Sequence, residues 1–313
     1  MSGPEGEAAV TMPATDTVGR PLTSPQPSAA RRSPTPQPGL SGLGFAILLG
    51  FGLLAAAAPL VAPYDPAAYS GEPLARPSPA HLLGTNDVGQ DILSELIYGS
   101  RVSLLVGLGG GSLITVLAAA IGTAAGYLRG WADWSLMRVV DFLMAIPHLP
   151  LMLLLAAYAG PGLLNVILVI VLLGWMVPAR VVRAQTLIIR GEAYVEAARA
   201  LGASSLDIMC RHVLPALGPI LVSVFVAQAA RAITLEAGLA FLGLGDPTVK
   251  SWGLMLRQAL SYRGIYFTPH WLWWLLPPGL CVSLLVLGIT LAGVGLEAKL
   301  DPRLRSIGKE VSR

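Results

Sequence analysis

Residues 192–215 read EAYVEAARALGASSLDIMCRHVLP and form a charged segment between two long apolar runs. Glu192 and Glu196 are four residues apart, so they share one face of a helix. Alanines fill the strongly helix-forming positions that follow, and Gly202 can end the helix in the left-handed conformation. Ser204 can then begin a second helix, immediately before the next apolar run. The spacing therefore predicts a short helix, a glycine break and a second short helix.

The composition places most of the chain in a membrane. Of its 313 residues, 54% are hydrophobic and only 12% are charged, whereas soluble domains carry about 25% charged residues. Runs of about 20 apolar residues are long enough to cross a bilayer as helices. Because the runs are continuous rather than alternating, helices are favoured over a β-barrel. We predict an all-α membrane protein with about six transmembrane helices, near residues 41–63, 102–127, 136–158, 162–184, 216–235 and 272–296.

The distribution of Lys and Arg predicts how the chain is oriented in the membrane. Cytoplasmic loops carry an excess of these residues. With six spans, most of them fall on one side: Arg31, Arg32, Arg129, Arg138, Arg180, Arg183, Arg190, Arg199, Arg211, Arg303, Arg305 and Lys309. Segment 64–101 is mostly acidic, although loop 246–271 with Lys250, Arg257 and Arg263 is a mild exception. We therefore expect both termini and the 192–215 loop in the cytoplasm, and segment 64–101 outside.

Asp141, Arg231 and Glu236 are three charged residues in or beside the apolar runs that need an explanation. Charges inside a membrane are candidates for the translocation path. However, a helix starting at Pro215 would place Arg231 about 24 Å and Glu236 about 31 Å along its axis, near the outer boundary of the bilayer. Interfacial or paired structural roles are therefore the alternative. For Asp141 the expected partner is Arg138, three residues earlier.

Motifs for chemistry are missing from the sequence. It contains no G-x-x-x-x-G-K-[ST] pattern, so we expect that this chain does not hydrolyse ATP. His81, His148, His212 and His270 are isolated and lack H-E-x-x-H spacing, which argues against a metal site. A G-x-S-x-G nucleophile elbow is also missing. We predict no catalytic residue, no metal ligand and no cofactor in this chain.

The 192–215 loop resembles the EAA loop of ABC importer permeases. Glu196-Ala197-Ala198, Gly202 and Leu214-Pro215 match that pattern in type and spacing. The pattern usually has isoleucine where this chain has His212, and histidine there is common in the dipeptide/oligopeptide branch. Residues 83–91, LGTNDVGQD, are similar to the LGTDDxGRD segment of the same branch, with Gln90 in place of the usual arginine.

The resemblance extends over residues 41–305. It includes five further elements, at residues 97–101, 129–131 with Asp141, 241–245, 251–253 and 300–303. Such a chain would be a C-type permease subunit that forms half of the pore for ATP-driven uptake of dipeptides or oligopeptides. The residues that would dock on an ATPase are Glu192, Glu196, Ala197, Ala198, Gly202, His212, Leu214 and Pro215.

The resemblance also implies partners and a location. It implies a homologous B-type permease, two cytoplasmic ATPase subunits that bind ATP and magnesium, and an extracytoplasmic solute-binding protein. The location would be the bacterial cytoplasmic membrane, in contact with lipid and without a nucleic-acid partner.

The expected domain organisation has five parts. Residues 1–40 are rich in Pro, Ser, Thr, Ala and Gly and should form a disordered cytoplasmic tail. The other parts are a first transmembrane helix, an extracytoplasmic segment, an ABC transmembrane type-1 permease domain and a cytoplasmic tail, at residues 41–63, 64–101, 102–297 and 298–313.

Three alternative functions make different demands on the sequence. A permease of the same family could carry another small solute such as nickel. A secondary transporter driven by an ion gradient would need acidic residues near the bilayer midplane, and the docking loop would then have no role. A membrane-embedded enzyme would need an assembled site, and the sequence offers none.

Overall fold

The computed structural model describes residues 38–300, with side chains from 40 to 297. Regular structure in this range is helical, apart from one isolated bridge between Thr85 and Asp91. The predicted tails, 1–40 and 298–313, lie outside the described residues except where the first helix begins at Pro38 and the last ends at Leu300.

Three to five helical stretches could cross a membrane. Three are long and apolar enough alone: Ile92–Leu128, Gly218–Phe241 and Pro269–Glu297. Two bent pairs of helices would make two more. The predicted first span, 41–63, corresponds to a shorter apolar helix, Leu40–Ala56.

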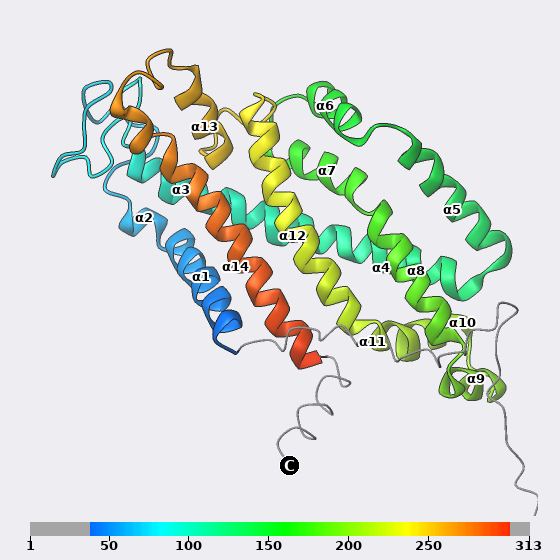
Figure 1. The fold of residues 1–313 in the computed structure, drawn as a ribbon. Coiled ribbons are helices and arrows are strands. Elements are labelled where there is room, and N and C mark those ends of the chain that lie inside the picture. The colour runs from blue at the N-terminus through cyan, green and yellow to red at the C-terminus, as the bar shows by residue number, and fades with distance from the viewer. Residues whose placement is uncertain (1–37, 301–313) are drawn as a thin grey trace, which may run out of the picture. The chain divides into compact units, whose positions relative to one another are not determined.

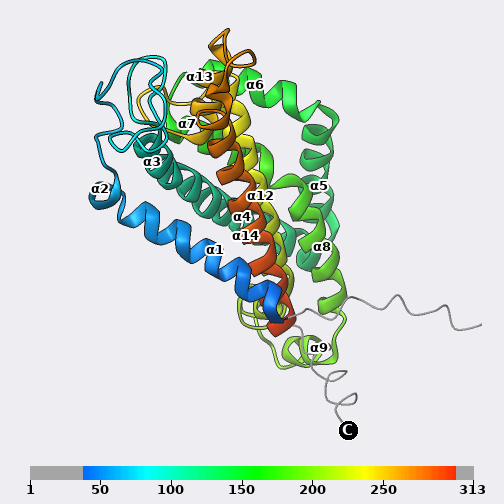
Figure 2. The same cartoon turned by 60° about the vertical axis from the view of Figure 1, so that its left-hand side comes forward.

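The first helix lies along the last one. Helix α1 (Pro38–Ala56) and helix α14 (Leu276–Leu300) run side by side in both views (Figures 1 and 2). A short helix, α2 (Ala58–Val61), follows α1. Arg101 satisfies the free carbonyls at the end of α1, because its Nε donates to Ala55 O at 2.6 Å and its Nη2 to Ala56 O at 3.3 Å.

The second long helix begins earlier than the apolar run predicts, at residue 92 instead of 102. It consists of α3 (Ile92–Leu104), a π-helical stretch η1 (Leu105–Gly110) and α4 (Gly111–Leu128). Asp91 caps α3 by accepting a hydrogen bond from Ser94 N at 2.8 Å. The apolar run does not indicate this helix start because α3 carries polar and charged residues in its first turn.

Small residues let α4 pack closely against two other helices. A Cβ at Gly111 would lie 2.8 Å from Ala229 Cα of α12 (Gly218–Phe241), so the absence of a side chain at Gly111 permits this close approach. A second pair, Gly122 and Gly126, faces α8 (Met176–Arg190), where an added Cβ would meet side-chain atoms at 2.7 Å. This G-x-x-x-G spacing sets the α4–α8 contact.

Both bent pairs break within the chain's apolar runs. Helices α5 (Gly130–Ala145) and α6 (His148–Ala159) meet at 87°, and Pro147 lies at the break between them. Helix α7 (Leu163–Gly174) meets α8 at 41°. The two breaks touch each other, since His148 Nε2 lies 3.1 Å from Leu173 O.

Pro277 and Pro278 lie in the first turn of α14, where a proline removes no helical hydrogen bond.

The two loop regions of interest lie at opposite ends of α12. One end carries irregular residues 62–91 and α13 (Trp252–Ser261), and the other carries α9 (Ala193–Ala200) and α10 (Ser205–Ile208) (Figures 1 and 2). The fold therefore separates the predicted docking loop from the predicted outer segment.

Candidate functional site

The docking loop, residues 192–215, has the predicted helix–break–helix form. Gly202 ends α9 with φ of +88°, a conformation that side chains disfavour. Gly202 N donates to Arg199 O at 3.0 Å, and Ala203 N donates to Ala198 O at 3.1 Å. This pair of hydrogen bonds is a Schellman motif, which fixes the direction in which the chain leaves α9.

The second half of the loop starts with a side-chain cap. Ser204 Oγ accepts a hydrogen bond from Asp207 N at 3.1 Å, as predicted for the start of α10. Asp207 also pairs with Arg211 at 3.0 Å. A π-helical turn, η2 (Met209–Val213), and a single turn that contains Pro215, α11 (Leu214–Ala216), then lead directly into α12.

The inner face of the docking loop is anchored in a small apolar cluster. Val195 of α9 and Ile208 of α10 are fully buried. They belong to one cluster with Tyr127, Val182, Val213 and Leu217, which come from α4, α8, η2 and the start of α12. The guanidinium groups of Arg199 and Arg190 lie 5.6 and 5.9 Å from the centre of the Tyr127 ring, within cation–π range. The loop therefore has a fixed position on the helix ends.

The outer face of the docking loop is open. Leu201 is 88% exposed and Leu206 is 70% exposed, and Glu196 and Ala197 of the same loop are exposed as well. Among the described residues, the ion pairs include neither Glu192 nor Glu196. Exposed leucines and carboxylates outside these ion pairs, carried by the same loop, can bind another protein through apolar contact and charge.

The eight predicted docking residues divide by exposure. Ala198 and His212 are half-buried, and the ring of His212 lies 6.5 Å from that of Tyr194. The other six are exposed: Glu192, Glu196, Ala197, Gly202, Leu214 and Pro215. The structure thus brings the set together on one loop.

Asp141 does not pair with Arg138, so that prediction is wrong. Asp141 of α5 pairs with Arg180 of α8, while the Arg138 guanidinium lies 5.4 Å from the centre of the Trp134 ring. A parallel pair joins the same helices, with Arg183 Nη2 donating to Asp133 Oδ2 at 2.7 Å. The facing helix supplies a better-placed cation than the neighbouring turn does.

The three candidate path residues do not form one site. Arg231 is exposed and lines a cavity of about 130 Å³ together with His148 and Gly174, at the breaks of the two bent pairs. Glu236, on the same helix, is only 3% exposed. No hydrogen bond or ion pair between residues 40 and 297 joins either of them to Asp141.

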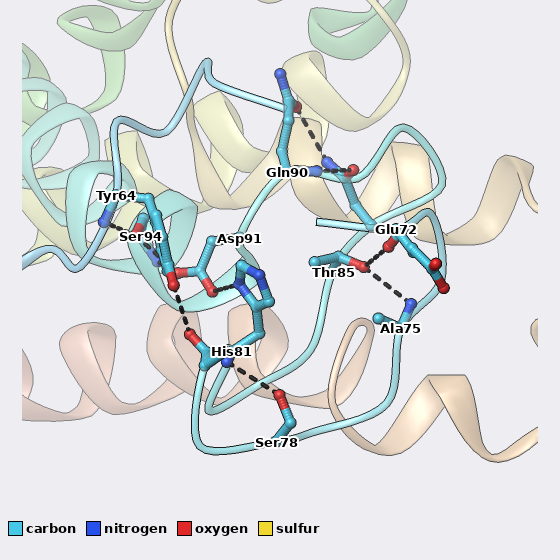
Figure 3. Close-up of polar contacts among 11 residues, drawn as sticks. Tyr64, Glu72, Ala75, Ser78, His81, Thr85, Gln90, Asp91 and Ser94 are labelled. Carbon is cyan, nitrogen blue, oxygen red and sulfur yellow. Dashed lines mark hydrogen bonds and ion pairs between the residues drawn. The ribbon is translucent and has the colours of Figure 1, made fainter. Parts of the chain in front are cut away.

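Residues 62–91 contain a buried polar assembly, part of which Figure 3 shows. His81 Nδ1 lies 2.9 Å from Asp91 Oδ1, and Asp91 Oδ2 accepts from Ser94 Oγ at 2.7 Å. The ring of Tyr64 stacks on His81 with centroids 4.8 Å apart. Thr85 Oγ1 donates to Glu72 O at 2.5 Å and accepts from Ala75 N at 2.9 Å. These contacts give an irregular segment a defined conformation.

Among residues 40–297, no group of three His, Cys, Asp or Glu side chains is placed to hold a metal ion.

Comparison with known proteins identifies the family. Residues 118–306 match the family model of the binding-protein-dependent transport system inner membrane component. The chain belongs to this family. It is thus a multi-pass permease component of an ABC transporter in the inner membrane, not the catalytic subunit, and the family implies ATPase and binding-protein partners.

Curated relatives of this permease are similar over most of their length. The glutathione transport system permease protein GsiD of Pectobacterium atrosepticum is 37% identical, over 74% of this chain and 75% of the relative. A putative peptide transport system permease protein of Brucella abortus biovar 1 is 41% identical, over 85% and 88%. The di/tripeptide transport system permease protein DppC of Pseudomonas aeruginosa is 36% identical, also over 85% and 88%.

Two solved structures share the fold. Both are inward-facing conformations of the MetNI methionine ABC transporter, with TM-scores of 0.56 and 0.55. They are 19% and 20% identical, and the matches cover 67% of this permease and 98% and 97% of those chains. At this identity the likeness concerns the arrangement of helices alone.

Several contacts of the permease were not predicted from its sequence. The G-x-x-x-G spacing of Gly122 and Gly126 is a signal that could have located the α4–α8 contact. The pair of Asp133 with Arg183 joins residues 50 positions apart, and that of Glu95 with Lys250 joins residues 155 apart. No local spacing could have indicated either pair.

Proposed function

We propose that this permease forms half of the pore of an ABC importer that takes up dipeptides or oligopeptides, with a B-type permease as the other half. The observation that carries the proposal is the 36–41% identity to relatives named for peptide or glutathione transport. The partner ATPases would bind ATP and magnesium and supply the energy.

We further propose six spans with both termini in the cytoplasm. The proposed parts are a cytoplasmic tail, a first span, an extracytoplasmic segment, the permease domain and a second cytoplasmic tail, at residues 1–40, 41–63, 64–101, 102–297 and 298–313. Two observations support this arrangement: most Lys and Arg residues fall on one side when the sequence is divided into six spans, and the docking loop and residues 62–91 lie at opposite ends of α12.

In this proposal the outer face of the docking loop binds a groove on an ATPase. The eight residues Glu192, Glu196, Ala197, Ala198, Gly202, His212, Leu214 and Pro215 would form or shape this contact. Only Gly191 and Glu192 separate α8 from α9, so a displacement of α9 would act directly on α8. The ion pairs of Arg180 and Arg183 with aspartates of α5 would transmit the displacement to α5. ATP-driven closure of the ATPases would thereby bias the pore between two states.

Of the three candidate path residues, we assign only Arg231 to the translocation path. Its side chain is exposed and lines the cavity at the helix breaks. Asp141 is engaged by Arg180, and Glu236 is buried, so we assign structural roles to both.

Uptake by reconstituted vesicles tests the cargo and the energy source. The complete transporter with its binding protein should accumulate labelled di- and tripeptides when ATP is present with the ATPases. A proton gradient without ATP should give no uptake. Nickel accumulation in place of peptides would overturn the cargo, and uptake driven by the gradient alone would overturn the mechanism.

Substitutions in the docking loop test the coupling. Gly202→Leu should strain the turn at φ +88°, and Glu196→Arg should reverse the charge of the outer face. Both variants should insert and pair with the partner permease but lose ATPase co-purification or substrate-stimulated ATP hydrolysis. Glu72→Arg, an exposed charge reversal at the opposite end, is the matched control. Wild-type values for both loop variants would show that the loop is only a connector.

Cysteine labelling tests the proposed orientation. In a background without Cys210 and Cys281, an impermeant reagent added outside the cell should modify Tyr69→Cys but not Leu206→Cys. Both positions are exposed in the structure, at 77% and 70%. The opposite labelling pattern would reverse the topology and remove the docking proposal with it.

A further inference from the structure

Lys250 links the connection between α12 and α13 to helix α3. It lies on the connection between α12 and α13, and its Nζ donates to Glu95 Oε1 of α3 at 2.6 Å. The same nitrogen donates to Gln90 Oε1 at 2.7 Å. Both members of the ion pair are buried, with 12% of the Lys250 side chain and none of the Glu95 side chain exposed. The contact therefore lies inside the protein, where water cannot screen the two charges.

Glu95 needs a positive charge close by. Its Oε1 also accepts a hydrogen bond from Asn86 Nδ2 at 3.1 Å, but that group is neutral. Its Oε2 is buried and has no hydrogen-bond partner among the described residues. Isolating a carboxylate from water without a counter-charge is strongly unfavourable. Within residues 40–297, Lys250 is the cation that forms an ion pair with Glu95.

Position 90 contributes a neutral side chain to this cluster. Gln90 keeps a polar contact with the cluster through its Oε1 but brings no charge. An arginine is longer than glutamine, and Gln90 Oε1 and Glu95 Oε1 already accept hydrogen bonds from the same ammonium group. A guanidinium from position 90 would thus reach the carboxylate, and its fork could serve Oε2 as well.

We propose that Lys250 is a positioning residue that supplies, from the α12–α13 connection, the positive charge that position 90 lacks. The consequence is a tie between two parts of the chain. Residues 62–91 are held to α3 through Gln90, Asn86 and Glu95, and Lys250 attaches this assembly to the α12–α13 connection. The same connection, through Gly243, Gly245 and Pro247, lines a cavity of about 320 Å³ that also contacts the α6–α7 turn. The ion pair therefore joins residues 62–91 to one wall of this cavity.

Charge relocation tests the tie in the purified full-length permease with its partner subunits. A nitroxide label at Val88, which is 46% exposed, reports the mobility of residues 62–91, and a label at Leu201 is the control at the other end. Both labels require replacement of Cys210 and Cys281. Lys250→Met should raise label mobility at residue 88 and leave it unchanged at residue 201. Adding Gln90→Arg to Lys250→Met should restore the wild-type spectrum, and Lys250→Arg should keep it.

Two results would overturn the proposal. One is unchanged mobility at residue 88 in Lys250→Met. The other is a Lys250→Met/Gln90→Arg variant that stays as mobile as Lys250→Met alone. If Lys250→Met cannot be purified, recovery of purified protein becomes the readout. Restored yield on adding Gln90→Arg then supports the tie, and no restoration overturns it.

A transport measurement extends the test and rests on the proposed function. Lys250→Met should lose binding-protein-stimulated ATP hydrolysis, and Gln90→Arg should recover it in the same background. Failure of the wild-type transporter to take up peptides would affect the proposed cargo alone, because the label mobility does not depend on cargo.

Discussion

The docking loop and residues 62–91 are both loops rich in polar residues, but they differ in which side chains are buried. In the docking loop, Val195 and Ile208 are turned inward and Glu196 is turned to solvent. In residues 62–91, His81 and Asp91 are buried and pair with each other. Unpaired polar groups at the surface are available to a partner, whereas buried pairs stabilise the fold. Whether the polar side chains are exposed or buried therefore distinguishes a contact surface from a structural element better than composition does.

The largest effect is expected at Asp91. Asp91→Ala removes the acceptor for Ser94 N and Ser94 Oγ and leaves His81 buried without its partner. Loss of a buried, charge-assisted network should lower the free energy of unfolding by about 3 kcal/mol. Unfolding of the purified permease in detergent, followed by circular dichroism, measures this. The matched control is Asp87→Ala, the same change at an exposed position. Equal stability of the two variants would mean that the buried assembly contributes nothing.

Val195 should show the next largest effect, because it is the inward-facing anchor of the docking loop. Val195→Ala leaves space in the cluster with Ile208 and Val182 and should cost about 2 kcal/mol of stability. Proteolysis between residues 192 and 204 should become faster as well. The control is Ala197→Gly, which changes a neighbouring exposed position in the same helix and should cost about 1 kcal/mol. If proteolysis is no faster than in wild type, the cluster does not hold the loop.

These two regions also differ in how much their sequences predict. The helix break at Gly202 and the cap at Ser204 depend on residues at most five positions apart, and the sequence predicted both. The network around Glu95 depends on Lys250, 155 residues away. A distant partner leaves no local spacing to recognise, and the same reason made the Asp141 partner wrong. Apolar runs located the long helices, but α3 was missed because its buried face includes Ser94 and Glu95.

Asp246 offers a smaller, pH-dependent effect at the end of the molecule that carries residues 62–91. Hydrogen bonds from Thr248 to Asp246 Oδ1, at 2.6 and 2.9 Å, lower the pKa of Asp246 below its ordinary value of 3.8. A lowered pKa means that the stabilisation is present above the unfolded value and is lost as the pH falls through the folded value.

Comparison of Asp246→Asn with wild type isolates that contribution. The wild-type advantage in unfolding free energy should be constant from pH 5 upward, on the order of one unit above the unfolded pKa, and should shrink as the pH is lowered below 4, close to the ordinary value. Thr248→Ala should reduce the pH-dependent part, because it removes the hydroxyl donor. An advantage that grows toward low pH would contradict the assignment.

The smallest effect on stability is expected at Leu201, where the function of the docking loop is tested most directly. Leu201 is 88% exposed, so Leu201→Ala removes almost no buried surface and should change the free energy of unfolding by less than about 0.5 kcal/mol. An exposed leucine side chain is unfavourable in water and would be buried if an ATPase bound this loop. The same variant should therefore weaken ATPase co-purification. Leu82→Ala, a 61% exposed leucine in residues 62–91, is the matched control and should leave co-purification unchanged. Equal co-purification in both variants would mean that the ATPase contact lies elsewhere. A loss of stability in Leu201→Ala would mean that the outer face packs within the protein. A loss of ATPase binding at unchanged stability is the combination that only an outward-facing contact surface produces.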